Sequence, residues 1–370
     1  MCIVGLTSLA TAARGVELLR PDGAFSIGIR SFVWTDDARD ELLTEDPNDK
    51  RKVPVDIWYP AKVKADAPTA PYVPDPEGWA GVYGADAPGL LRQVRTHAVQ
   101  DAEMAAGDHP FPVAVFSHGA GQSPRFYTTL LEDLASHGFV VIAISHFGAG
   151  RGSFPGRGFV EPSRNWSPPS HLHALDKDAE LYAFWEPMVE TLSSDQRFVL
   201  DKLARLNADD ATFKARLDLQ KVALAGHSRG CKAVFRTCRK DDRCKAALIL
   251  DDPPPPPERR GLSQPTLIMH PAEASESMST FTGEFMKNTT GAAYRVAIEG
   301  IEHMDFADLR YLAPDRFSAR STTPQQALKI VRSFALAFLD SALKSKSPEG
   351  VTTLAKAFPE VEIETKPSSR

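Results

Sequence analysis

The sequence lacks the features that mark several large classes of protein. No apolar stretch reaches the ~18 residues that a transmembrane helix needs, so none is expected. No run of lysine and arginine is long enough to follow a phosphate backbone, and the formal net charge of -5 gives no general attraction for nucleic acid. No metal-ligand spacing is present; His171 and His173 come nearest and are interpreted as a polar loop. We therefore expect no nucleic-acid partner, no metal and no cofactor.

Cysteine is also scarce, with four in 370 residues. Cys238 and Cys244 flank a charged turn and could close a small disulfide loop, whereas Cys231 is interpreted as a buried thiol. A disulfide would favour an oxidising compartment. Residues 2–13 resemble the later part of a secretory signal that lacks its basic first part. A frayed terminus or a misassigned start explains them equally well, so the compartment stays open, with a lean to secreted or periplasmic.

What the sequence does contain is a series of apolar runs that alternate with helical patterns. Helices are expected after Ser123, from Leu181, after Gly230 and after Thr323. The strands are predicted at Gly23–Trp34, Val53–Pro60, Phe111–Ser117, Phe139–Ser145, Val222–Ala225, Ala246–Leu250, Thr266–His270 and Ala292–Ile298. Pro54 suggests that the second of these strands lies near an edge. Strands alternating with helices predict an α/β fold, a mostly parallel sheet with helices on both faces.

One stretch of the sequence indicates a catalytic function for this predicted fold. The strand Val222–Ala225 runs into Gly226-His-Ser-Arg-Gly230, a G-x-S-x-G sequence, and Cys231–Cys238 suits a helix. Strand, tight turn and helix are the context of the nucleophile elbow of α/β-hydrolases. The two glycines let the strand and the helix approach each other, and the helix N-terminus offers free N–H groups to an anion beside the serine. We therefore predict that Ser228 is a nucleophile.

A serine needs a base that takes its proton and an acid that orients the base. In α/β-hydrolases these partners follow the nucleophile in the order acid, histidine. Asp251 comes directly after the strand Ala246–Leu250 and is predicted as the acid, with Asp252 as the alternative. His303 lies between the last predicted strand and the final helix and is predicted as the base, with His270 as its competitor.

The oxyanion of the tetrahedral intermediate needs two backbone donors. One is expected to be the N–H of Arg229, directly after the nucleophile. The other should come from His118–Gly121, which follows a buried strand. Ala120 is our prediction, with Gly121 and Gln122 as alternatives.

These residues resemble a known family, the platelet-activating-factor acetylhydrolases of the plasma and intracellular type II kind. The likeness is carried by Ile57–Pro60, Phe116–Gly121, Leu130–Ser145, Ala225–Gly230, Leu250–Asp251 and His303–Ala307. The resemblance implies a metal-independent serine esterase whose acid, base and oxyanion donors occupy the places of Asp251, His303, Ala120 and Arg229. Three departures put a phospholipid substrate in question: Arg229 stands where the family often has an apolar residue, prolines fill 253–257, and 147–173 has no match.

We expect one α/β-hydrolase domain over residues 23–346, with an N-terminal segment 1–22 and a C-terminal tail 347–370. The irregular segments 61–107 and 147–173 are predicted to roof the site. The predicted activity is hydrolysis of short-acyl esters, small-molecule or lipid, through an acyl-enzyme, with transient contact to a lipid surface. The alternatives are a polyester, aryl-ester or lactone hydrolase with the same triad, or a non-catalytic binding protein that retains the fold. The sequence assigns no oligomeric state.

Overall fold

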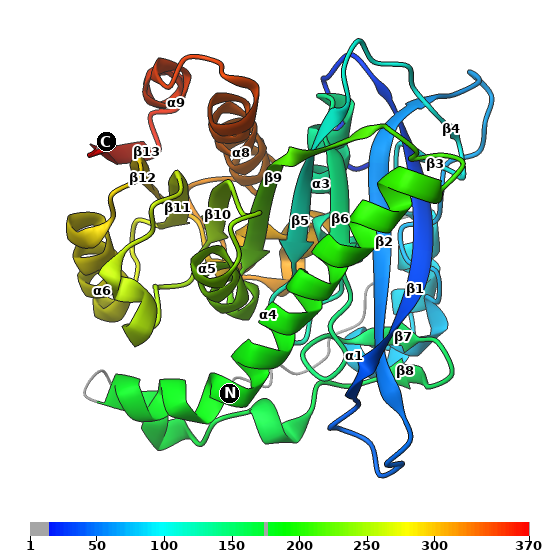
Figure 1. Cartoon of the computed structure of the whole chain (residues 1–370), viewed down its shortest axis with the longest axis horizontal. Coiled ribbons are helices and arrows are strands. Elements are labelled where there is room, and N and C mark those ends of the chain that lie inside the picture. The colour runs from blue at the N-terminus through cyan, green and yellow to red at the C-terminus, as the bar shows by residue number, and fades with distance from the viewer. Residues whose placement is uncertain (1–14, 174–176, 370) are drawn as a thin grey trace.

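The computed structural model describes residues 15–173 and 177–369. Its centre is a sheet of eleven strands in the order β13-β12-β11-β10-β9-β5-β6-β2-β1-β3, with β4 paired to β2 (Figure 1). The strands are β1 (Ser26–Asp40), β2 (Lys50–Lys62), β3 (Ala98–Gln100), β4 (Glu103–Met104), β5 (Phe111–Ser117), β6 (Val140–Ile144), β9 (Leu217–His227), β10 (Ala246–Leu250), β11 (Thr266–Pro271), β12 (Ala293–Ile298) and β13 (Val361–Lys366). The neighbours from β6 through β5 and β9 to β12 are all parallel. A separate hairpin joins β7 (Gly152–Phe154) to β8 (Gly158–Val160).

Helices cover both faces of this sheet. One face packs against α3 (Thr128–Ser136) and α8 (Pro324–Lys344), and the other against α4 (Asp178–Asp209), α5 (Arg229–Lys240) and α6 (Glu276–Asn288). Figure 1 shows α4 and α5 in front of the strands. The short helices are α1 (Ala80–Tyr83), α2 (Ala87–Gln93), α7 (Leu309–Leu312) and α9 (Glu349–Leu354). Strands β5, β6, β10 and β11 are buried along their whole length, as expected of parallel strands covered twice. The predicted α/β class is confirmed.

The position of β2 differs from the expectation raised by its proline. This strand lies inside the sheet, between β1 and β6, rather than near an edge. The carbonyl of Pro54 accepts the N–H of Ser145 (2.9 Å), so the proline nitrogen faces the same side. Because β6 has already ended at Ile144, no ladder hydrogen bond is lost there.

In the described residues, both ends of the chain pack against the domain, whereas a separate N-terminal segment and C-terminal tail were expected. Within 347–370, α9 is followed by β13, which pairs antiparallel with β12 and extends the sheet. Its apolar side chains alternate with exposed charged ones, because an edge strand buries only one face. Near the N-terminus Leu18 is buried and its N–H donates to the carbonyl of Arg95 (3.0 Å). The signal-like residues 2–13 lie outside the described residues.

Two smaller expectations concern the cysteines and the membrane. The structure joins Cys238 to Cys244 in a disulfide, and Cys231 is a buried free thiol. No helix in the described ranges is both long and apolar enough to cross a bilayer.

Candidate active site

The turn between β9 and α5 holds Ser228 in a conformation that L-residues rarely adopt, with φ 53° and ψ -128°. The two flanking glycines permit this turn. A Cβ on Gly226 would lie 2.7 Å from the carbonyl carbon of Gly230, and one on Gly230 would lie 2.9 Å from the carbonyl oxygen of His118. Any larger residue would push strand and helix apart. The local geometry is that of an elbow that presents the serine hydroxyl at the carboxyl edge of the sheet.

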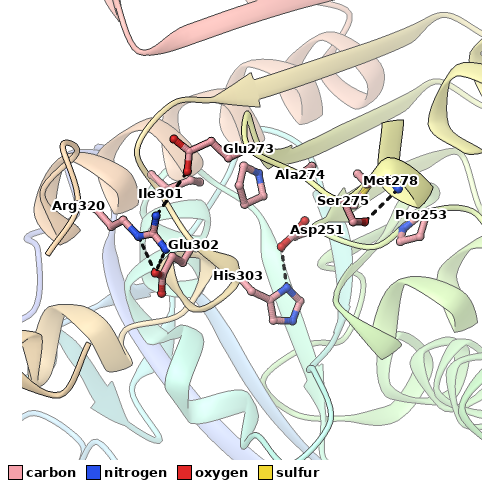
Figure 2. Close-up of a pocket in the computed structure, with 11 residues that line it drawn as sticks. Asp251, Pro253, Glu273, Ala274, Ser275, Met278, Ile301, Glu302, His303 and Arg320 are labelled. Atoms are coloured by element: carbon pink, nitrogen blue, oxygen red, sulfur yellow. Dashed lines mark hydrogen bonds and ion pairs between the residues drawn. The ribbon is translucent and has the colours of Figure 1, made fainter. Parts of the chain in front are cut away.

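Asp251 and His303 meet at the same edge. Asp251 follows β10 directly, and His303 opens a 3-10 turn after β12. The Nδ1 of His303 lies 2.6 Å from an Oδ2 of Asp251 (Figure 2). This bond places the ring proton on Nδ1 and leaves Nε2 as a proton acceptor. The imidazole is 47% exposed while the carboxylate is 11% exposed, so the base is much more accessible to a reactant than the acid.

Burial and charge act in opposite directions on His303. Burial disfavours the imidazolium, but the hydrogen bond to Asp251 and the charges of Asp251 and Asp252 outweigh it, so the pKa of His303 is raised above its ordinary value. The Ser228 hydroxyl makes no hydrogen bond to His303 within the described residues. The structure therefore brings acid and base into contact, and presents the serine beside them without a direct bond.

The alternative acid and base are occupied elsewhere. Asp252 forms an ion pair with Lys232 at 2.9 Å. His270 is buried, its Nδ1 donates to the carbonyl of Pro271 (2.7 Å), and its Nε2 accepts from Arg295 (2.9 Å). With both ring nitrogens engaged, His270 has no atom left for a serine. The geometry favours Asp251 and His303 over both competitors.

Backbone N–H groups near the elbow distinguish among the predicted oxyanion donors. The N–H of Gly121 donates to the carbonyl of Ala149 (2.8 Å), and that of Gln122 donates to the carbonyl of Gly119 (3.1 Å). The N–H of Ala120 has no partner in the described part of the chain, and neither does that of Arg229, the first residue of α5. These two donors are therefore available to an anion, whereas the alternatives Gly121 and Gln122 are not.

A buried hydrogen-bond chain, not expected from the sequence, ties these parts together. The N–H of Gly119 donates to the hydroxyl of Tyr127 (3.1 Å), which donates to Nδ1 of His227 (2.8 Å). The Nε2 of His227 then donates to the carbonyl of His303 (3.0 Å). Burial, together with the charge of His303, holds the pKa of His227 well below its usual range, so this ring stays neutral. This series of hydrogen bonds links the Gly119 loop, the elbow and the backbone of the predicted base.

Sequence reasoning missed both side chains for identifiable reasons. In the sequence Tyr127 has the spacing of an apolar helical stripe with Leu130, Leu131 and Leu134, and its ring is buried. His227 occupies the variable position of the G-x-S-x-G motif. A polar residue at the end of an otherwise apolar strand was the available signal for His227, but nothing in the sequence paired it with a tyrosine 100 positions earlier.

A second set of serine, histidine and aspartate side chains lies under the loop that contains Gly119. The Nε2 of His146 is 2.9 Å from the hydroxyl of Ser117, and its Nδ1 is 2.9 Å from the carboxylate of Asp195. All three side chains are completely buried, and Asp195 also pairs with Arg51. The N–H of His146 donates to Nε2 of His118 (3.1 Å). Because no substrate can reach Ser117, this series supports the loop rather than reacting.

Two features next to the candidate site bear on what it can bind, a loop contact and a cavity. The 147–173 segment touches the elbow, where the carbonyl of Trp166 accepts from the side chain of Arg229 (2.9 Å). On the acid side of His303 a cavity of about 350 Å³ is lined by Asp251, Met278 and the Arg320–Glu302 ion pair (Figure 2).

One group of side chains has ligand atoms close enough to hold a metal ion in the described residues: Asp22, Asp133 and His137. Both carboxylates already pair with Arg332. Gly138, which follows this histidine, lies beside the first residue of β5, at the edge of the sheet opposite Ser228. The group is therefore separate from the candidate active site.

The comparisons with known proteins concern the family and the fold of the chain. The family model described as "Platelet-activating factor acetylhydrolase, isoform II" matches residues 11–149, and the model of the alpha/beta hydrolase fold matches 112–278. A platelet-activating factor acetylhydrolase of Cavia porcellus is 24% identical over 314 residues, which cover 78% of this chain and 72% of the relative. That of Gallus gallus is 20% identical, with 90% and 86% covered. A ferulic acid esterase from Streptomyces cinnamoneus superposes with a TM-score of 0.74 at 27% identity, covering 94% and 99%. The predicted fold is confirmed.

Proposed function

The chain is a platelet-activating-factor-acetylhydrolase-like α/β-hydrolase and a serine ester hydrolase, and from this premise we propose that Ser228, His303 and Asp251 are its catalytic triad. The carrying observation is the 2.6 Å bond between Asp251 and His303 at the edge where the strained elbow presents Ser228. The proposed reaction is hydrolysis of short-acyl esters through an acyl-enzyme.

The proposed chemistry follows from which atoms are free. The Ser228 hydroxyl attacks the ester carbonyl carbon while Nε2 of His303 takes its proton. The Asp251 carboxylate, bonded to Nδ1, stabilises the imidazolium that forms. The free N–H groups of Ala120 and Arg229 donate to the oxyanion, and each such donor is worth about 10²–10³ in turnover. His303 returns the proton to the leaving alcohol, and water then attacks the acyl-enzyme with His303 again as base.

Short acyl groups are the proposed preference, because the relatives named above are acetylhydrolases. An aryl ester is the second candidate, and a specific observation favours it. The similar Streptomyces enzyme is a ferulic acid esterase, and the ring of Trp185 stacks against the guanidinium of Arg229 at the elbow. A flat aromatic wall suits an aromatic ring.

An ester series separates the two candidates. We expect kcat/KM to be highest for p-nitrophenyl acetate and to fall through the butyrate to the octanoate, with methyl ferulate slower than the acetate. The same series with phosphatidylcholine vesicles tests the proposed lipid contact: a vesicle-dependent rise for the octanoate alone supports it. A maximum at the octanoate, or at methyl ferulate, would replace the short-acyl assignment.

The Tyr127–His227 chain makes a further prediction. Changing Tyr127 to phenylalanine leaves the buried N–H of Gly119 and Nδ1 of His227 unpaired, so the His227 ring that donates to the carbonyl of His303 loses the bond that fixes it. We expect a loss of about 1–3 kcal/mol in the free energy of unfolding and about a tenfold fall in kcat with little change in KM. Urea unfolding and kinetics with p-nitrophenyl acetate measure both.

The matched control is Tyr294→Phe, which removes the hydroxyl of a mostly buried tyrosine, a hydroxyl that has no hydrogen bond in the described part of the molecule. It should leave kcat unchanged. Equal kcat values for the two variants would show that the chain does not position the reacting groups.

A further inference from the structure

Arg229 lies beside the proposed nucleophile and carries a positive charge that no carboxylate of the described residues pairs with. It is the residue after Ser228 and the first of α5, and its side chain is only partly exposed. One guanidinium nitrogen, Nη1, donates to the carbonyl of Trp166 (2.9 Å). The guanidinium carbon lies 5.3 Å from the ring centroid of Trp185. Both contacts are with uncharged groups.

No carboxylate lies within ion-pair distance of Arg229 in the described ranges. The charge of Asp252 acts on the pKa of Arg229, but Asp252 is already held by Lys232 at 2.9 Å. Burial lowers the pKa of Arg229, and the charge of Asp252 offsets this only in part. The guanidinium thus bears a desolvation cost that no anion of the described chain balances.

The arginines that are more deeply buried than Arg229 show how this protein normally balances that cost. Each of the four arginines that are at most 7% exposed contacts a carboxylate directly. These pairs are Arg51 with Asp195 and Glu41, Arg125 with Asp56, Arg236 with Glu186 and Glu190, and Arg310 with Asp305. Arg229 is partly exposed and, like the partly exposed Arg216 and Arg316, forms no such pair in the described residues, but of these three it is the one beside the proposed nucleophile. A group that arrives with the substrate is the anion that would complete it.

We propose that the Arg229 side chain binds an anionic group of the substrate, so that the preferred esters carry a carboxylate near the ester carbonyl. The inference rests on the proposed function and deepens it. A guanidinium presents paired N–H donors in the geometry of a carboxylate, and here only one nitrogen is used by Trp166. Because the N–H of Arg229 faces the oxyanion, the same residue holds the reacting carbonyl by its backbone and the anion by its side chain.

Two pairs of esters test this, each matched in size and different in charge. The first pair places the carboxylate in the acyl group, p-nitrophenyl hemiglutarate against p-nitrophenyl pentanoate. The second places it in the alcohol, p-acetoxybenzoate against methyl p-acetoxybenzoate. The measured quantity is the ratio of kcat/KM for the anionic ester to that for the neutral ester. Both members of a pair use the same serine and oxyanion donors, so damage to the chemistry cancels in the ratio.

In at least one pair we expect Arg229→Met to lower this ratio by about tenfold or more, mainly through KM. Arg229→Lys should recover part of it, and added salt should lower the ratio of the wild type but not that of Arg229→Met. The control is Arg164→Met, which removes an exposed arginine two residues from Trp166. It should keep the wild-type ratio.

The outcomes separate the two proposals. A fall in the ratio in either pair supports the inference and identifies the end of the ester that carries the anion. Equal ratios for wild type and Arg229→Met in both pairs overturn it, while Ser228-dependent hydrolysis of the neutral esters leaves the proposed function standing. Failure to hydrolyse any of the four esters overturns the proposed function and this inference with it.

Discussion

Replacing Ser228 by alanine is expected to abolish the burst of p-nitrophenol from p-nitrophenyl acetate and to lower kcat/KM by about 10⁴-fold or more. The burst measures acylation of the enzyme, and no acyl-enzyme can form without the hydroxyl at the elbow. The backbone should tolerate the change, because residue 228 keeps a Cβ and its N–H still donates to the carbonyl of Leu250 (2.9 Å). Stopped-flow absorbance measures the burst, and circular dichroism verifies the fold.

Ser117 supplies a demanding control, since it too lies 2.9 Å from a histidine that contacts an aspartate. Ser117→Ala removes a buried hydroxyl that also accepts from Gln196 (2.9 Å), so it should cost stability but keep the burst. A fluorophosphonate probe should label the peptide that contains Ser228. Label on Ser117, or a burst that survives in Ser228→Ala, would refute the assignment of the nucleophile.

The strained turn at Ser228 could be predicted because its evidence is local. The two glycines, the apolar strand and the helix all fall within about 20 residues, and each has one steric reason to be there. The contact between Asp251 and His303 could be predicted from chain order, because parallel strands bring their carboxyl ends to one edge. The choice between Ala120, Gly121 and Gln122 could not, since it depends on which N–H groups the loop uses for its own turn.

The features that the sequence concealed are those set by distant partners. Pro54 favoured a position near an edge, yet its strand β2 is internal. The sheet tolerates the proline, which has no N–H to donate, because β6 has already ended at Ile144. The strand β13 carries only alternate apolar residues and resembles a polar tail until β12 is beside it. Arg229 was visible as a departure from the family that the sequence resembles. That its charge has no carboxylate partner among the described residues emerged only from the packing of Trp166, Trp185 and Lys232.

Changing Asp251 to asparagine is the second prediction with a large effect, a fall of about 10⁴-fold in kcat for p-nitrophenyl acetate. An amide nitrogen facing Nδ1 of His303 favours the wrong tautomer, which puts the ring proton on Nε2, where the serine proton must go. The pH profile should move as well. Asp251 raises the pKa of His303, and the neutral imidazole is the active base, so the acid limb of kcat/KM lies above the ordinary histidine value in the wild type. Without that charge the limb should shift to lower pH.

Asp252→Asn is the matched control for Asp251→Asn. Both variants replace a carboxylate by an amide, but the two carboxylates have different partners. Asp252 pairs with Lys232, and its charge is the smallest of the influences named on His303. Its loss should reduce stability, since Lys232 is 5% exposed and loses its counter-charge. It should keep most of kcat and move the acid limb only slightly. If Asp252→Asn loses activity as severely as Asp251→Asn, or if the acid limb of Asp251→Asn stays in place, the imidazole is not oriented by the carboxylate it touches. The acid of the triad would then have to be sought among other side chains.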